Sequence, residues 1–278
     1  MRSLIKLGAF VAALLSVAPA IAEDGRELRI CADPNNMPFS NSAQAGFENK
    51  LAELIGQKLR KTISYTWWTQ RRGFIRNTLK AGLCDVVIGV PAHYDPVEST
   101  RPYYRSTYVF VSQAKRNLQL SAIDDPRLRQ LTVGVHLIGD DGNNTPPAHA
   151  LGEQGIVDNV RGYLIYGDYR EPDPPARLIE AVENGDVDLA AAWGPLAGYV
   201  AKISKVPLTV IPITGGARFV PLQFQFDIAM GLRKGEDSLR DKLNDFIAQN
   251  ATEIAALLKS YDVPLIEPGR SAVSEDQP

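Results

Sequence analysis

Four polar side chains that could bind a small ligand follow a short apolar segment at residues 28–31. They are Asp33, Asn35, Asn36 and Ser40. The apolar segment is typical of a buried strand. After a turn marked by prolines, apolar residues recur at helical spacing from Phe47. Because ligands of α/β proteins bind where a strand gives way to a loop and a helix, we expect these residues to form one wall of a cleft. The alternative is turn chemistry, which the same residue types favour.

A second group of candidate residues is aromatic or basic. Its members are Trp67, Trp68, Tyr103, Tyr104, Arg105 and Trp193. These residue types are enriched in protein interfaces, and Trp193 ends a predicted strand where a side chain can reach a cleft. Successive strand residues face opposite ways, so we expect at most one of Trp67 and Trp68 to be exposed. The alternative for each aromatic residue is a place in the core.

The segment 139–145 is a polar loop before a helix that we expect to begin at Pro146. It contains Asp140, Asp141, Asn144 and Thr145, with Thr145 as the expected N-cap. A helix N-terminus attracts anions, but the two aspartates oppose that preference. Their spacing matches no calcium loop, so we predict no metal site here. The loop is a candidate second wall of the cleft, and a simple capped surface loop is the alternative.

The sequence contains none of the common catalytic motifs. Its three histidines, His93, His136 and His149, are scattered, and no nucleophile elbow, zinc-protease motif, P-loop or dinucleotide-binding motif is present. We therefore predict a binding protein without a cofactor rather than an enzyme.

The first 22 residues have the pattern of a secretory signal peptide. Arg2 and Lys6 precede an apolar run that is too short to span a bilayer, and Ala20 and Ala22 form the expected cleavage site. Cleavage would take the Lys plus Arg count from 30 to 28 against 32 Asp plus Glu, a net charge of −4. This balance argues against nucleic acids and anionic membrane surfaces as partners, and we expect an exported protein with no membrane span.

The chain has two cysteines, Cys31 and Cys84. Cys31 lies on the first predicted strand, and Cys84 precedes another strand that could be its parallel neighbour. An exported protein can form disulfides, so we predict a bridge between them. Two buried free thiols are the alternative, and the lack of a C-x-x-C motif argues against a metal site.

Strand and helix signals alternate along the chain, which predicts an α/β fold. Strands are expected near residues 63–68, 85–90, 103–111, 131–138, 187–193 and 226–232, and helices near 70–81, 175–183, 196–203 and 238–261. The last strand and helix fit the first unit better than the second. We therefore predict a first lobe of residues 23–112 and 224–267, a second lobe of 113–223, and a disordered tail at 268–278. Crossings near Val111 and Phe224 would form a hinge.

Taken together, these segments resemble a known family. The chain is similar to type II periplasmic solute-binding proteins, and specifically to the MxaJ/XoxJ type encoded beside pyrroloquinoline quinone methanol dehydrogenases. The resemblance is carried by RICADPNNMPFSN, GFENKLAEL, QRRGFIRNTL, AGLCDVVIGVPA, TRPYYRSTYVFV, LIGDDGNNTPPAHAL, NVRGYLIYGDY, WGPLAGY and FDIAMG, in this order. It implies a two-lobed fold around a central cleft, a periplasmic location and a quinoprotein dehydrogenase as partner.

One departure from the superfamily bears on the ligand. Amino-acid receptors of this fold carry an arginine soon after the strand equivalent to residues 85–90, and that arginine clamps the ligand carboxylate. Here Arg101 comes later than that spacing, which argues against an amino-acid ligand. Three functions remain as hypotheses: an accessory protein of a methanol dehydrogenase, a solute receptor of an ABC transporter, and an enzyme on this fold.

Overall fold

The computed structural model describes residues 27–138, 144–165 and 170–266. The predicted signal peptide, the tail from residue 268, and the candidates Asp140 and Asp141 lie outside these ranges.

The first half of the sheet contains three parallel strands covered by helices. Strands β1 (Glu27–Ala32), β4 (Thr62–Trp67) and β5 (Val86–Pro91) pair in the order β4-β1-β5. Helix α1 (Phe47–Leu59) packs on them together with α6 (Asp237–Gln249) and α7 (Ala251–Ser260). The short elements of this half are β2 (Asn35–Asn36), β3 (Ser40–Asn41), β6 (Glu98–Ser99) and α2 (Phe74–Asn77).

The second half repeats this plan. Strands β8 (Val133–Leu137), β9 (Val160–Leu164) and β10 (Leu189–Trp193) are parallel, and β11 (Leu208–Pro212) is antiparallel to the long strand β7 (Tyr104–Gln113). Its helices are α3 (Pro146–Glu153), α4 (Arg177–Asn184) and α5 (Gly194–Ile203).

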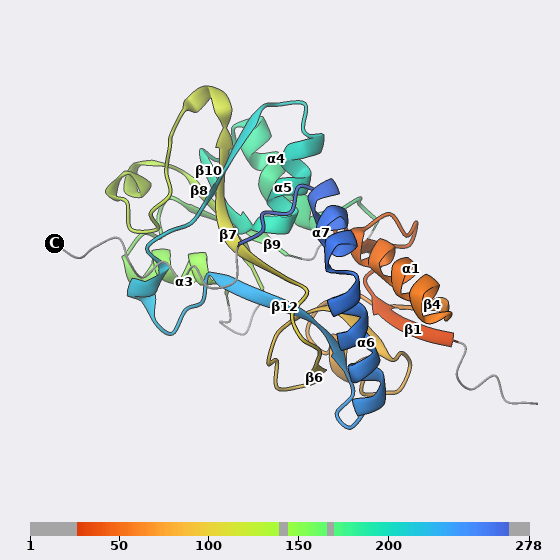
Figure 1. Cartoon of the computed structure of the whole chain (residues 1–278). Helices are drawn as coiled ribbons and strands as arrows, with labels where there is room; N and C mark the ends of the chain where they lie inside the picture. The colour runs from red at the N-terminus through yellow and green to blue at the C-terminus, as the bar shows by residue number, and fades with distance from the viewer. Residues whose placement is uncertain (1–26, 139–143, 166–169, 267–278) are drawn as a thin grey trace, which may run out of the picture.

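Two long strands connect the halves. In Figure 1, β7 (Tyr104–Gln113, yellow) and β12 (Gln225–Leu232, light blue) run side by side through the middle of the molecule. Residues 104–107 of β7 pair with β12, whereas residues 108–113 pair with β10 and β11. The partners of β7 therefore change between Thr107 and Tyr108, a few residues before the crossing expected near Val111. The fold is the two-lobed α/β architecture that the sequence predicts, although the residues that bound each lobe stay a proposal.

The cores follow from apolar spacing. Phe47, Leu51 and Ile55 recur every four residues, so they share one face of α1, and all three are fully buried. Their core also takes residues from β1, β5, β12, α6 and α7. Two further cores contain only residues between 109 and 224. Each half thus has an interior of its own.

Cys31 and Cys84 form a disulfide, as the sequence predicts. Their Cα atoms are 5.4 Å apart, because Cys31 lies on β1 and Cys84 lies two residues before β5, the parallel neighbour of β1. The next residue, Asp85, accepts hydrogen bonds from the guanidinium groups of Arg29 and Arg233. Burial raises the pKa of Asp85, but these bonds outweigh burial and lower it overall.

Two predicted helices differ from the observed ones. The helix expected at 70–81 is reduced to Phe74–Asn77, because Gly73 adopts a left-handed conformation before it and Thr78 ends it. The helix expected at 238–261 is broken at Asn250. Asn250 has φ −118° and ψ 22°, outside the helical range, and its side chain joins its own N–H in donating to the Phe246 carbonyl. Among the described residues, no helix is long and apolar enough to cross a membrane.

Removal of the disulfide should destabilise the first half of the molecule. The bridge closes a loop of 53 residues in sequence separation, so replacing both cysteines by alanine should lower the free energy of unfolding by about 3–4 kcal/mol. Urea denaturation of the oxidised protein and of the double variant measures this difference. Free thiols in the oxidised wild-type protein, or an unchanged denaturation midpoint, would contradict the expectation.

Candidate functional site

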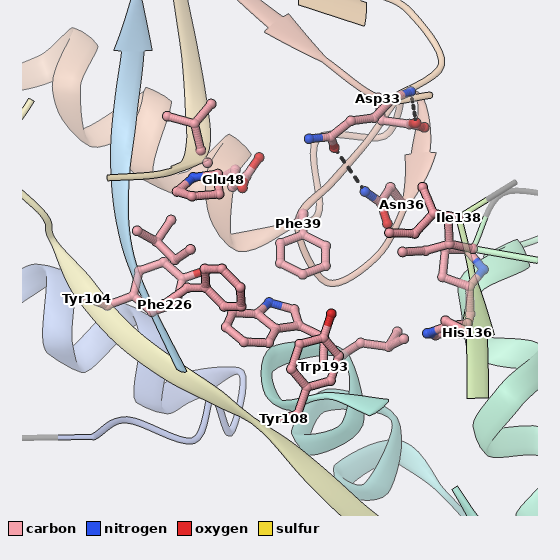
Figure 2. Close-up of a pocket in the computed structure, with 18 residues that line it drawn as sticks. Asp33, Asn36, Phe39, Glu48, Tyr104, Tyr108, His136, Ile138, Trp193 and Phe226 are labelled. Atoms are coloured by element: carbon pink, nitrogen blue, oxygen red, sulfur yellow. Dashed lines mark hydrogen bonds between the residues drawn. The ribbon is translucent and has the colours of Figure 1, made fainter. Parts of the chain in front are cut away.

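A cavity of about 470 Å³ lies where the two halves meet. Figure 2 shows side chains entering it from the loop after β1, from α1, and from β7, β8 and β12. It is lined by Asp33, Asn36, Phe39, Glu48, Gln70, Gly89, Val90, Pro91, Tyr104, Tyr108, His136, Ile138, Ile165, Pro175, Trp193, Leu196, Phe226 and Ile228. Its size suits a small molecule.

Aromatic rings form most of one wall. Trp193 lies edge-to-face with Tyr108 at 5.3 Å and with Phe226 at 5.8 Å between ring centroids. Trp193 is there because β10 ends at the cleft, and Tyr108 and Phe226 come from the two connecting strands. Tyr104 shares a strand face with Tyr108, since the two are four residues apart. The ring of Phe39 reaches the cavity from the opposite side.

Glu48 places a carboxyl group in this largely apolar space. It lies in the first turn of α1 and is half-buried, with its carboxyl group against Gly89 of β5. A Cβ atom at position 89 would overlap Glu48 Oε1, so glycine makes room for the carboxyl. Burial raises the pKa of Glu48 from its ordinary 4.5 to about 8, and the nearby charge of Asp33 adds to the effect. Glu48 is therefore mostly protonated at neutral pH when the cavity holds no ligand.

Asp33 is the second carboxyl group of the cavity. It is 2% exposed, and its carboxylate accepts hydrogen bonds from the backbone N–H groups of Asn35 at 2.8 Å and Gln70 at 2.6 Å. Ser40 Oγ accepts a bond from the Asp33 N–H and donates one to its carbonyl. Asn36 donates its side-chain amide to Gln70 Oε1. These bonds fix the loop after β1 as a rigid wall.

His136 contributes a neutral ring from the second half. It is buried, and its Nε2 donates to the Pro175 carbonyl at 3.0 Å, which places the proton on that nitrogen. Burial lowers the pKa of His136 to about 4, although the bond to Pro175 partly opposes this. The ring therefore carries no charge at neutral pH.

No lysine or arginine lines the cavity among the described residues. The two internal segments outside the description, 139–143 and 166–169, contain no lysine or arginine in their sequence. Arg101 is exposed, and its backbone N–H bonds to Asn244 Oδ1. The arginine clamp of amino-acid receptors has no counterpart on the cavity wall that the structure describes.

Asn35 joins the two halves across the cleft. Its side-chain amide donates to the Glu171 carbonyl at 2.7 Å, and its Oδ1 accepts from the Asp173 N–H at 2.9 Å. The Met37 N–H also bonds to the Asp173 carboxyl, whose pKa is nevertheless raised by burial. Asn35 thus acts as a latch that holds the halves together beside the cavity.

Four of the candidate residues named from the sequence line the cavity: Asp33, Asn36, Tyr104 and Trp193. The structure places the other described candidates elsewhere, whereas Asp140 and Asp141 lie outside the described residues. Asn35 forms the latch, and Ser40 supports Asp33. Trp67 stacks on Tyr65 and packs on the first core, whereas Trp68 is 41% exposed, so only one of this pair is exposed, as alternation predicts.

The remaining candidates have local roles. Tyr103 packs on the first core, and Arg105 lies near Asp227, with 3.8 Å between Nε and Oδ1. The Asn144 N–H donates to His149, and buried Thr145 donates its hydroxyl to the His136 carbonyl rather than capping α3 with its side chain.

The sequence reasoning missed several lining residues, above all Glu48, Tyr108, His136 and Phe226. Glu48 had a usable signal, because it begins the helix that follows the first strand and its loop. Tyr108 and Phe226 had no such sequence signal, since they reach the cavity only through the way the two connecting strands pair. Among the described residues, no cluster of three or more histidine, cysteine or acidic side chains could hold a metal ion.

Comparison with known proteins points to one group. A family model described as bacterial extracellular solute-binding proteins, family 3, matches residues 28–262. MoxJ of Methylorubrum extorquens is 30% identical over 260 residues, which cover 90% of this chain and 85% of MoxJ.

Two solved structures extend the comparison. The periplasmic binding protein XoxJ of Methylobacterium extorquens AM1 is 35% identical with a TM-score of 0.71, covering 86% of this chain and 99% of XoxJ. MxaJ of Methylophaga aminisulfidivorans is 25% identical with a TM-score of 0.75, covering 86% of this chain and 100% of MxaJ.

Glu48→Gln should stabilise the protein in alkaline but not in acidic solution. Between about pH 4.5 and 8 the unfolded chain releases the Glu48 proton while the folded protein keeps it, so wild-type stability falls as pH rises through this range. The variant does not lose stability in this way, so near pH 8 its free energy of unfolding should exceed that of the wild type. The difference should be a few kcal/mol at most, because solvent in the cavity reaches the carboxyl. Urea denaturation across this range, with Glu53→Gln as control, tests it. An equal gain near pH 4 would disprove the assignment.

Asn35→Ala should open the cleft. The change removes two hydrogen bonds between the halves and nothing within the first half, so the open form should gain population and the radius of gyration in small-angle scattering should increase. Asn36→Ala is the matched control, because among the described residues the side-chain amide of Asn36 bonds to Gln70 in the same half and to nothing in the other half. Identical scattering of the two variants would argue against the latch.

Proposed function

Because the chain belongs to family 3 of the bacterial extracellular solute-binding proteins, and within it to the MxaJ/XoxJ type, we propose that it is a non-catalytic periplasmic accessory protein. Its partner would be a pyrroloquinoline quinone methanol or alcohol dehydrogenase, whose maturation or activation it would aid. The observation that carries this proposal is the likeness to MoxJ, which extends over 90% of the chain. The periplasmic location and the link to methanol oxidation come with that likeness.

A surface groove of the first half suits a protein partner. It lies beside α2 and is lined by four basic residues, Arg71, Arg72, Arg76 and Lys80, together with apolar groups that include Phe74 and Tyr94. Trp68, which is 41% exposed, is three residues away in sequence from Arg71. Tryptophan and arginine are the residues that most often dominate binding energy in interfaces. We propose that this groove and Trp68 contact an acidic region of the dehydrogenase.

An ABC-transporter receptor for a small solute is the second candidate. The observation in its favour is the cavity between two latched halves, the usual arrangement of a solute receptor. A receptor should bind its solute tightly and ignore the dehydrogenase. A third possibility, an enzyme, would show turnover in a screen of alcohols and common hydrolase substrates, which we do not expect.

Trp68→Ala should weaken binding to the dehydrogenase. Loss of an exposed aromatic contact in the interface should cost about 1–2 kcal/mol, roughly a tenfold rise in Kd, and higher salt should weaken binding further because the groove is basic. Calorimetry with purified quinoprotein methanol dehydrogenase measures both effects.

The control variant is Ile203→Ala. Ile203 is 59% exposed at the far end of α5 from the cavity residue Leu196, so its replacement should leave Kd unchanged. No binding at micromolar concentrations, together with unchanged methanol oxidation when the protein is deleted, would favour the transporter receptor over the accessory protein.

A further inference from the structure

We propose that the cavity binds a small organic cation with an apolar body, such as an alkylated ammonium ion, held between the Glu48 carboxylate and the surrounding aromatic rings. The inference rests on the proposed function only in that the protein acts by binding. Titrations with the cation and with the dehydrogenase are separate, so either idea can fail alone.

The charges around the cavity favour a positive ligand. Glu48 places a carboxyl group in the cavity, and no lysine or arginine lines the cavity among the described residues. The neutral ring of His136 does not change this balance. A carboxylate or phosphate would be buried beside the Glu48 carboxyl without a cationic partner, at a large cost. A cation instead carries the charge that pairs with the Glu48 carboxylate.

The rings supply the second half of the site. Phe39, Tyr104, Tyr108, Trp193 and Phe226 all line the same cavity. The face of an aromatic ring is electronegative and attracts a cation within about 6 Å of the ring centroid, most strongly when both are shielded from water. The same rings pack well against methyl or methylene groups. An inorganic cation has no such groups and gains nothing from this packing.

Binding of the cation should displace one proton. A positive charge beside Glu48 stabilises its carboxylate, so the carboxyl proton passes to solvent as the ligand enters. The other titratable groups near Glu48 or across the cavity from it are Asp33 from the loop after β1, Tyr65 on β4, Tyr103, Tyr104 and Tyr108 on β7, and His136 on β8. Burial raises the pKa of the four tyrosines and lowers that of the histidine, so these five stay neutral from about pH 6 to 9.

Choline and 3,3-dimethylbutan-1-ol are matched probes, because the alcohol replaces the quaternary nitrogen of choline by carbon at nearly the same shape. Calorimetry of the whole protein at about pH 8.5 should show choline binding tenfold or more tighter than the alcohol. Affinity for choline should fall as the pH is lowered to about 6.5, because Glu48 takes up its proton, and affinity for the alcohol should not. The anion 3,3-dimethylbutanoate should bind more weakly than either.

Two variants separate the carboxyl from the rest of the cavity. Glu48→Gln should bring the affinity for choline down to that for the alcohol, whereas Glu53→Gln, on the exposed side of the same helix, should change neither. Three results would overturn the inference. They are no binding of choline up to about 10 mM, equal or tighter binding of the alcohol or the anion, and a preference for choline that survives in Glu48→Gln. Tighter alcohol binding at low pH would instead indicate that protonated Glu48 donates to a neutral ligand.

Discussion

The pairing of β7 with β12 is the constraint on which the rest of the molecule depends. Residues 104–107 of β7 hold β12, and the next residues of the same strand hold β10 and β11. One continuous strand therefore belongs to both halves of the sheet. The cavity lies along this pair, since Tyr104, Tyr108, Phe226 and Ile228 all line it. The strands that connect the two halves thus also form a wall of the cavity. A movement of the halves relative to each other would therefore change the shape of the aromatic surface that contacts a ligand.

The buried position of the Glu48 carboxyl group lowers the stability of the folded protein. A carboxyl group enclosed by apolar side chains loses hydration, and the glycine at position 89 gives up a side chain to make room for it. Neither choice improves the fold, because a shorter apolar side chain at position 48 would leave room for an alanine at position 89 and would carry no charge. Strained or poorly hydrated groups of this kind concentrate where a protein binds its ligand. We therefore interpret the Glu48 carboxyl as a ligand-binding group.

The sequence predicted the parts of this structure that depend on local pattern. Apolar runs located β1, β5 and β12, and the positions of Cys31 and Cys84 predicted their bridge. The helix at 70–81 was wrong because a left-handed Gly73 and the end at Thr78 interrupt the apolar spacing. Asp33 and Trp193 were found because each ends a strand at the cleft. Phe226 and His136 were not, because only the pairing of distant strands brings them to one space.

The interleaved chain path has a consequence for how the protein reaches its native form. The core of the first half needs residues from 28–104 and again from 228–263, whereas both cores of the second half use only residues between 109 and 224. As the polypeptide emerges N-terminus first, the second half has its whole interior before β12 exists. The core of the first half cannot form until α6 and α7 have been synthesised, and until then Phe47 and Leu51 stay exposed. A chain that ends before residue 228 would therefore have a complete second half but an incomplete first half with exposed apolar residues. Chaperones and proteases recognise such exposed apolar segments.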